Sequence, residues 1–230
     1  MTTRAANPEA TLLAIETSAA ALSVALRVGG KVVARHLQVP RGQSKLTIPT
    51  IAEIFEEAGI AAKDLDAVAF GRGPGSFTGI RVATSIAQGI GLAVGIPLLP
   101  ISSLACLAQG VINREHSDQV LVCLDARLGE VYWGLFAARE GRAVLRGEER
   151  VDQPAAVERP RNGFAIVGSA LGLGDEHLDE LRGAAEHCDA ALDPNARDLL
   201  MLAGDAWMES QAVAAEDAAP VYLRHRVVSR

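Results

Sequence analysis

Two acidic residues at the ends of apolar runs are the first residues of this sequence whose type and position suit chemistry. Glu16 follows LLAI, and Asp125 follows VLVCL. Two carboxylates that face a cleft could position a divalent metal ion and a water molecule. No evident base or phosphate-binding lysine accompanies either acid. The sequence therefore favours the competing interpretation, in which each carboxylate caps a turn or a helix.

A glycine-rich segment, GRGPGSFTG at residues 71–79, is the second chemical feature. Glycines before a helix allow backbone N–H groups to point at an anion, which makes Gly71, Gly73 and Gly75 candidate cofactor-binding residues. The spacing matches neither of the two common phosphate-binding glycine motifs, and the segment contains no lysine. A tight, closely packed turn between a strand and a helix is therefore the favoured interpretation.

Histidines and cysteines show no spacing that predicts a metal site or a disulfide. No two histidines stand four residues apart, and the three cysteines are odd in number and far apart, which favours buried thiols in a reducing compartment. These residues are His36, His116, His177, His187, His225, Cys106, Cys123 and Cys188.

The composition excludes a mainly disordered chain and disfavours a nucleic-acid-binding protein that acts alone. Hydrophobic residues make up 49% of the 230 residues, enough for a substantial core. Twenty-two Lys and Arg residues stand against 28 Asp and Glu residues, a net charge of −6, whereas RNA or DNA binding needs a basic face. Residues 1–10 lack the apolar core of a signal peptide and read as a disordered tail.

The stretch from Val82 to Asn113 has no charged residue and is long enough to span a membrane. Pro97 and Pro100 interrupt it, and a lone spanning helix rarely contains two prolines. We therefore expect a helix, a short strand and a second helix, all within a protein core rather than a membrane.

Apolar runs and turn signals predict an α/β protein with a repeated unit. In each half, three strands form a meander, a helix crosses over, and a further strand ends in a glycine loop. Gly29-Gly30 marks the first hairpin, and Ser44 is the expected N-cap of the first helix. The expected strands are 11–17, 21–28, 31–39, 67–70, 119–125, 131–138, 143–151, 164–168 and 220–224, and the expected helices include 44–58, 76–94 and 196–212.

This internal correspondence favours two duplicated lobes, in which Glu16 and Asp125 occupy equivalent positions. We expect the N-terminal lobe at 11–102 and the C-terminal lobe at 103–230.

Three segments resemble the TsaB (YeaZ) family: LLAIETSAAALSVAL at 12–26, AFGRGPGSFTGIRVATSIAQGIGLA at 69–93 and LDARLGEVYWGLF at 124–136. The resemblance covers most of residues 11–138. It implies two ββαβα lobes of the actin, sugar-kinase and Hsp70 (ASKHA) superfamily. It also implies a non-catalytic, cytoplasmic subunit without a cofactor, which binds and activates the enzyme TsaD in the formation of threonylcarbamoyladenosine in tRNA.

The same resemblance implies the remaining partners. The ATPase TsaE joins within the complex, tRNA is reached only through it, and the isolated chain can form a homodimer. TsaD holds a metal through an H-x-x-x-H pair, and alignment of the glycine loops places Ser103 and Leu107 at those positions. Serine is a poor metal ligand and leucine is none, which argues against a metallopeptidase.

A partner interface is expected on the helix that follows the glycine loop. Small residues recur there every four positions on one face, flanked by isoleucines, so that another helix could approach closely. Spacing alone equally allows this face to pack on the chain's own sheet. The resemblance adds the helix at 44–58 and implies a helical bundle with the partner. The expected interface residues are Leu46, Thr50, Ile54, Gly79, Ala83, Ile86, Ala87, Ile90 and Gly91.

Two smaller expectations concern charged residues. Arg127 and Glu130 could form a local ion pair in their turn, and the basic end, Arg224, His225, Arg226 and Arg230, could touch tRNA within the complex. The alternative function that remains open is an autonomous nucleotide-dependent ATPase or kinase of the same superfamily.

Overall fold

The strands form two separate sheets that have the same internal order. The computed structural model describes residues 7–39 and 42–224. In the first sheet the order is β3-β2-β1-β4-β5, and in the second it is β11-β10-β6-β7-β8, with β9 also paired to β7. Each sheet has an antiparallel meander whose first strand continues into two parallel neighbours. This repetition confirms the predicted α/β fold with two lobes of the same strand order.

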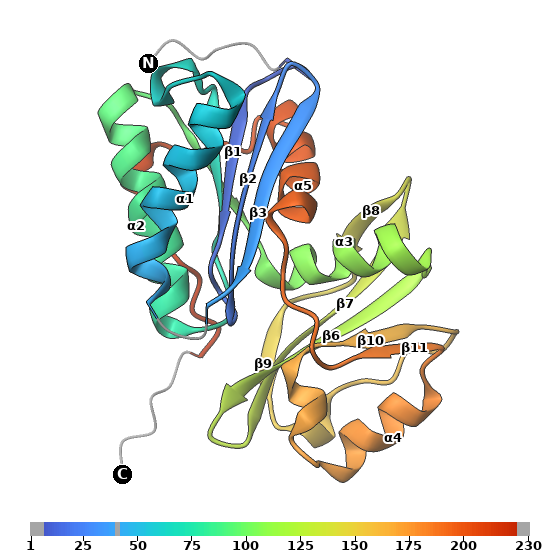
Figure 1. Ribbon diagram of the computed structural model, residues 1–230. Coiled ribbons are helices and arrows are strands. Elements are labelled where there is room, and N and C mark those ends of the chain that lie inside the picture. Colours follow the sequence, from blue (N-terminus) through green and yellow to red (C-terminus); the bar gives the residue numbers. More distant parts are fainter. Residues whose placement is uncertain (1–6, 40–41, 225–230) are drawn as a thin grey trace. The chain divides into compact units, whose positions relative to one another are not determined.

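The N-terminal half contains the elements that the sequence predicts there, together with the short helix η1 (Figure 1). They are β1 (Leu12–Glu16), β2 (Ala21–Val28), β3 (Lys31–Gln38), α1 (Gln43–Ala58), η1 (Ala62–Asp64), β4 (Ala67–Gly71), α2 (Phe77–Val94), β5 (Leu98–Ile101) and α3 (Ser103–Glu115).

The second half contains two long strands, β6 and β7, together with several short elements. They are β6 (Gln119–Arg127), β7 (Glu130–Arg139), β8 (Arg142–Leu145), β9 (Arg150–Asp152), η2 (Pro154–Ala156), β10 (Ala165–Val167), η3 (Ser169–Gly172), α4 (Glu176–Ala184), β11 (His187–Asp189), α5 (Ala196–Met208) and η4 (Ala215–Asp217).

Helices cover both faces of the first sheet, because successive residues of a strand point to opposite sides. Leu13 and Ile15 of β1 join a core cluster with α1 and α2 on one face. Leu12 and Ala14 join a second cluster with α5 on the other (Figure 1). The second sheet has its own core beneath α4 and η3.

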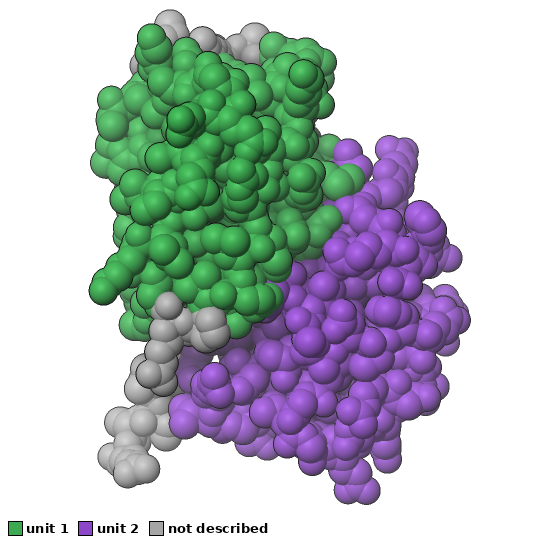
Figure 2. Space-filling model, in the orientation of Figure 1, with its two compact units in different colours: residues 1–106, 194–220 green, residues 107–193, 221–230 purple. Residues whose placement is uncertain are grey.

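The chain divides into two compact units whose boundary differs from the expected one (Figure 2). Unit 1 comprises Met1–Cys106 and Pro194–Pro220, and unit 2 comprises Leu107–Asp193 and Val221–Arg230. Helix α5, which was expected in the C-terminal lobe at 103–230, therefore belongs to unit 1. The reason is the apolar side of α5, which buries Leu199 and Ala203 against the first sheet.

Several local expectations are corrected by the structure. Gly42, with φ +85°, occupies the N-cap of α1 in place of Ser44, which lies inside the helix. The expected strand at 143–151 is split into β8 and β9, and residues 220–224 form no strand. Residues 1–6 of the expected tail, and His225, Arg226 and Arg230, lie outside the described residues. Ala10 is buried beside β1.

Candidate functional site

The glycine loop between β4 and α2 is closely packed against the turn that follows β1. A Cβ atom added at Gly71 would lie 2.0 Å from Oε2 of Glu16, and one at Gly75 would lie 2.5 Å from the carbonyl oxygen of Ser18. The N–H of Ser76 donates to that carbonyl at 2.7 Å. Gly73 differs, since its φ of +91° is a conformation that favours glycine. The loop geometry thus matches the tight-turn interpretation of Gly71, Gly73 and Gly75.

Glu16 is buried at the end of β1, and groups of its own unit hold its carboxylate. The Ser18 N–H donates to Oε1 at 2.6 Å, and the Ser103 hydroxyl donates to Oε2 at 2.9 Å. Burial raises the pKa of the Glu16 carboxyl, and hydrogen bonds from Ser18, Ser103 and the Thr17 backbone oppose that rise to a smaller extent. This geometry holds the turn after β1 and ties β1 to the start of α3.

Ser103 and Leu107, the positions aligned with a metal-binding pair, are both buried in α3. The Ser103 hydroxyl donates its hydrogen bond to Glu16, and the Leu107 side chain is a hydrocarbon without a metal-binding atom. Among residues 7–39 and 42–224, no group of three or more His, Cys, Asp or Glu side chains could hold a metal ion.

Asp125 lies near the end of β6 and is engaged within unit 2. Its Oδ1 accepts the Arg127 N–H at 2.7 Å, and its Oδ2 pairs with the Arg127 guanidinium at 3.0 Å. The expected Arg127–Glu130 pair is therefore wrong, because the Arg127 guanidinium pairs with Asp125, on the other side of the bulge in β6. Glu130 instead pairs with Arg224.

Arg224 fixes the β6–β7 turn. Its Nε donates to the Glu130 carboxylate at 2.9 Å, and its Nη2 donates to the carbonyl oxygen of Ala126 at 3.1 Å. Of the basic C-terminal group that could touch tRNA, the one described member is thus engaged within unit 2.

The row of small residues on α2 faces the chain's own sheet. A Cβ added at Gly79 would lie 1.8 Å from the carbonyl oxygen of Thr17, and one at Gly91 would meet Ala215, Ile96 and Leu98 at 3.0 Å. Ala83 and Ala87 are fully buried in the same core cluster. This packing corrects the expectation that the row meets a partner, because its surface is already used within unit 1.

The remaining expected interface residues are divided between core and surface. Thr50 and Ile54 of α1 are buried, and Ile86 and Ile90 of α2 are half-buried against the core. Leu46 stays exposed. Only part of the expected interface is therefore available to another molecule.

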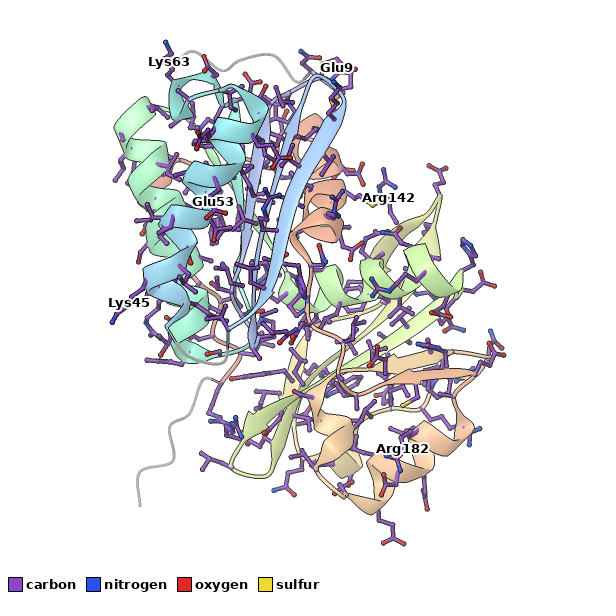
Figure 3. The ribbon with its side chains drawn as sticks, viewed as in Figure 1. Glu9, Lys45, Glu53, Lys63, Arg142 and Arg182 are labelled. Atoms are coloured by element: carbon purple, nitrogen blue, oxygen red, sulfur yellow. The ribbon has the colours of Figure 1, made fainter. Side chains whose placement is uncertain are left out.

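Exposed large apolar side chains remain on α1 and α2, and we call this set of residues the outer helical face. Its side chains are Leu46, Ile48, Phe77 and Leu92, with exposed fractions of 42%, 62%, 66% and 62%. Ser85 and Gly89 between them are exposed and small. Lys45, on the same helix as Ile48, points away from the sheet (Figure 3). Sequence reasoning missed most of this face, although Ser85, Gly89 and Ala93 repeat the four-residue spacing of the buried row.

Among the described helices, α2 is also the one long and apolar enough to cross a membrane by length and composition. Helices that pack on a sheet pass the same test, and α2 does pack on a sheet. One third of its 18 residues are buried, so its hydropathy partly reflects the outer helical face.

Comparisons with known proteins agree with the fold and extend over nearly the whole chain. A family model described as TsaD, tRNA N6-adenosine threonylcarbamoyltransferase, matches residues 37–172. The Escherichia coli tRNA threonylcarbamoyladenosine biosynthesis protein TsaB is 36% identical over 221 residues, covering 94% of this chain and 95% of that protein. The Haemophilus influenzae protein of the same name is 35% identical over 229 residues, covering 94% of each.

Solved structures give the same result at the level of the fold. YeaZ from Pseudomonas aeruginosa superimposes with a TM-score of 0.88 at 39% identity, covering 93% of this chain and all of that one. A second structure from the same organism, described as an uncharacterized protein with similarity to peptidase YeaZ, also gives a TM-score of 0.88 and 39% identity.

Proposed function

The chain belongs to the TsaB (YeaZ) family of tRNA threonylcarbamoyladenosine biosynthesis proteins, and from this premise we propose that it is a non-catalytic subunit that binds and activates TsaD. Its involvement in that biosynthesis follows from the family. The proposal concerns how it takes part: it docks on TsaD through the outer helical face and favours the competent TsaD conformation. A ligand shifts a conformational equilibrium by its difference in affinity for the two states, and here the protein subunit is that ligand.

The observation that carries the proposal is the outer helical face. Ile48, Phe77 and Leu92 are each more than 60% exposed on two adjacent helices that cover one face of the sheet. Covering what remains exposed of each would contribute about 1–2 kcal/mol per side chain, from the usual free energy of burying a large apolar residue. Exposed apolar patches of this kind mark interaction surfaces.

The family match supports TsaD as the occupant. The TsaD family model aligns with residues 37–172, which include α1 and α2, so the two proteins share this helical pair at the level of sequence. Two similar pairs can pack on each other as a pseudo-symmetric bundle, and two copies of this chain can do the same as a two-fold homodimer. We propose the heterodimer as the working state and the homodimer as the state of the isolated chain.

The non-catalytic part of the proposal rests on the two acids and on the aligned metal positions. Glu16 is held by Ser18 and Ser103, and Asp125 is held by Arg127. Catalytic acids must instead reach substrate or metal. We propose that chemistry resides in TsaD, that TsaE and tRNA join only in the assembled complex, and that the complex works in the cytoplasm.

The test uses a paired substitution on the outer helical face, Ile48→Arg with Leu92→Arg. The matched control is Leu128→Arg with Leu173→Arg, two exposed leucines of unit 2 that receive the same added charge. Complex formation with TsaD is measured by calorimetry, and threonylcarbamoyl transfer to tRNA is measured with the reconstituted system.

We expect the first pair to abolish measurable TsaD binding and transfer, because two buried guanidinium groups would lack partners. The control pair should bind TsaD as the parent does. Equal TsaD affinity in the two variants would refute docking through this face. Turnover of ATP by the isolated chain would contradict the non-catalytic assignment.

A further inference from the structure

A groove of about 550 Å³ in unit 2 is not used by any feature described above. It lies between the loop that follows β8 and the loop that precedes β10, over Trp133 and Leu135 of β7. Its size falls within the range of ligand-binding clefts in proteins.

Arginines dominate the groove lining. Arg146, Arg150, Arg159 and Arg161 all line it, and all four are exposed. Within residues 7–39 and 42–224, none of these four guanidinium groups lies within 4.0 Å of a carboxylate. Four cations that have no carboxylate partner in the described chain therefore converge on one concave surface.

The acidic residues of the groove do not neutralise it. Glu148 and Glu158 are the two acids in the lining, so the lining keeps a net charge of +2 on a chain whose total is −6. Arg150 lies over the ring of Trp133, with its guanidinium carbon 5.8 Å from the ring centroid, which gives this arginine a fixed platform. The Trp133 N–H donates to Asp152 at 2.9 Å and keeps that ring in place.

We propose that this arginine groove binds the phosphodiester backbone of RNA, and specifically that of the tRNA on which the complex acts. The proposal rests on the proposed function, because the assembled complex is what brings a tRNA to this chain. A guanidinium group can grip a phosphate with two parallel hydrogen bonds, which makes arginine well suited to a phosphate backbone.

The remaining lining favours RNA over other anions. The amides of Gln119 and Asn162 offer both donors and acceptors, which suit the ribose 2′-hydroxyl that accompanies each RNA phosphate. Of the large apolar lining side chains, Trp133 is buried and Leu135 is half-buried, so the exposed side chains of the groove are mainly the arginines. Because the whole chain is acidic, the groove supplies a few backbone contacts that add to the affinity of the complex, and it is not a complete RNA site by itself.

The test reverses two groove charges, Arg159→Glu with Arg161→Glu. The control, Arg139→Glu with Arg197→Glu, makes the same change of net charge at exposed arginines outside the groove. The affinity of the preformed TsaD complex for labelled tRNA is measured by fluorescence anisotropy across a salt series. Affinity for TsaD is measured separately by calorimetry.

For the groove pair we expect the dissociation constant of tRNA to rise about tenfold near 0.1 M salt. The slope of log affinity against log salt should also fall by about two, one for each phosphate that the groove no longer binds. Binding to TsaD should not change. The control should keep the parent slope and lie within about twofold of the parent affinity, since its arginines bind no phosphate.

Three results would overturn the proposal. The first two are an unchanged tRNA affinity in the groove pair and an equal loss of tRNA affinity in the control pair. The third is a groove pair that loses affinity for tripolyphosphate, titrated alone, but keeps its affinity for tRNA. The last would assign the groove to a small polyphosphate ligand. Failure of the parent chain to bind TsaD would instead refute the proposed function. The tRNA affinities of the two pairs can also be compared on the isolated chain at low salt. If the groove binds RNA, the groove pair should have the lower affinity there too, whether or not TsaD binds.

Discussion

Two glycines of α2, ten residues apart, should respond to alanine in opposite directions. Gly79 lies against the turn after β1, where an added Cβ would be 1.8 Å from a backbone carbonyl oxygen, whereas ordinary contact begins near 3.4 Å. The three nearest atoms are all backbone atoms of Thr17 and Ser18, so the contact cannot be relieved by the movement of a flexible side chain. At Gly89 an added Cβ would meet nothing within 4 Å. The pair thus separates the buried row of α2 from its outer side.

The magnitude for Gly79→Ala follows from three contributions. Overpacking typically costs about 1–3 kcal/mol, and loss of the buried hydrogen bond from the Thr17 hydroxyl to the Gly79 carbonyl oxygen, 2.7 Å long, costs about 1–2 kcal/mol more. The higher helix propensity of alanine returns about 0.5–1 kcal/mol, so the net loss is about 1–4.5 kcal/mol. Gly89→Ala has only the propensity gain and should stabilise unit 1 by about 0.5–1 kcal/mol.

The assay uses the distribution of tryptophans, because the chain has two and each unit contains one. In a Trp133→Phe background, Trp207 of α5 reports urea unfolding of unit 1. With a slope of about 2 kcal/mol per molar urea, Gly79→Ala should lower the midpoint by about 0.5–2 M, and Gly89→Ala should raise it by about 0.3–0.5 M. A Gly79→Ala midpoint within 0.2 M of the parent, roughly the error of the fit, would refute the packing argument.

The remaining predictions concern titratable groups. Because burial raises the pKa of Glu16 in the folded chain, its contribution to stability is present in full below the pKa of the unfolded chain and is lost as pH rises through the folded value. The unfolding free energy of Glu16→Gln should therefore rise relative to the parent over that interval, as measured by urea titrations at several pH values; a difference that is constant with pH would contradict it. Cys188 is exposed, whereas Cys106 and Cys123 are buried and burial raises the pKa of Cys123 to about 12. A thiol-specific reagent should thus modify one cysteine quickly and the other two only on unfolding, and mass spectrometry of the modified peptides would reveal any other order.

The antiparallel meander of each sheet could be predicted from the sequence because local signals determine it. Buried strands are short apolar runs, and Gly29-Gly30, both with positive φ, close the first hairpin as expected. The meander follows once each run is assigned, since sequential strands usually pair, whereas the pairing of β4 with β1 and of β10 with β6 joins strands that are not sequential. The repetition of this order then indicates the two lobes.

The orientation of α2 could not be predicted in the same way. Two of its faces carry small residues four positions apart, and periodicity does not say which of them meets the sheet. The buried row is Gly79, Ala83, Ala87 and Gly91, and the outer row is Ser85, Gly89 and Ala93. The distinction is made by contacts with the turn after β1, more than sixty residues earlier in the chain.

Long-range partners account for the other differences. Ser103 reaches Glu16 across 87 residues, and Arg224 reaches Glu130 across 94. Neither pairing leaves a local pattern in the sequence. The arginine groove likewise assembles side chains from two loops that are separated by β9 and η2.

Because α5 packs on unit 1, this unit cannot be completed until most of the chain has been translated. Residues 12–101 emerge first from the ribosome, yet one face of their sheet, with Leu12, Ala14 and Leu99, is covered only by a helix that begins at Ala196. At about 5–20 residues per second, the nascent sheet waits roughly 5–20 s for that cover, while the residues of unit 2 are made in between. The part of the protein that is begun first is thus completed last, and during this interval its bare apolar face is a natural substrate for chaperones.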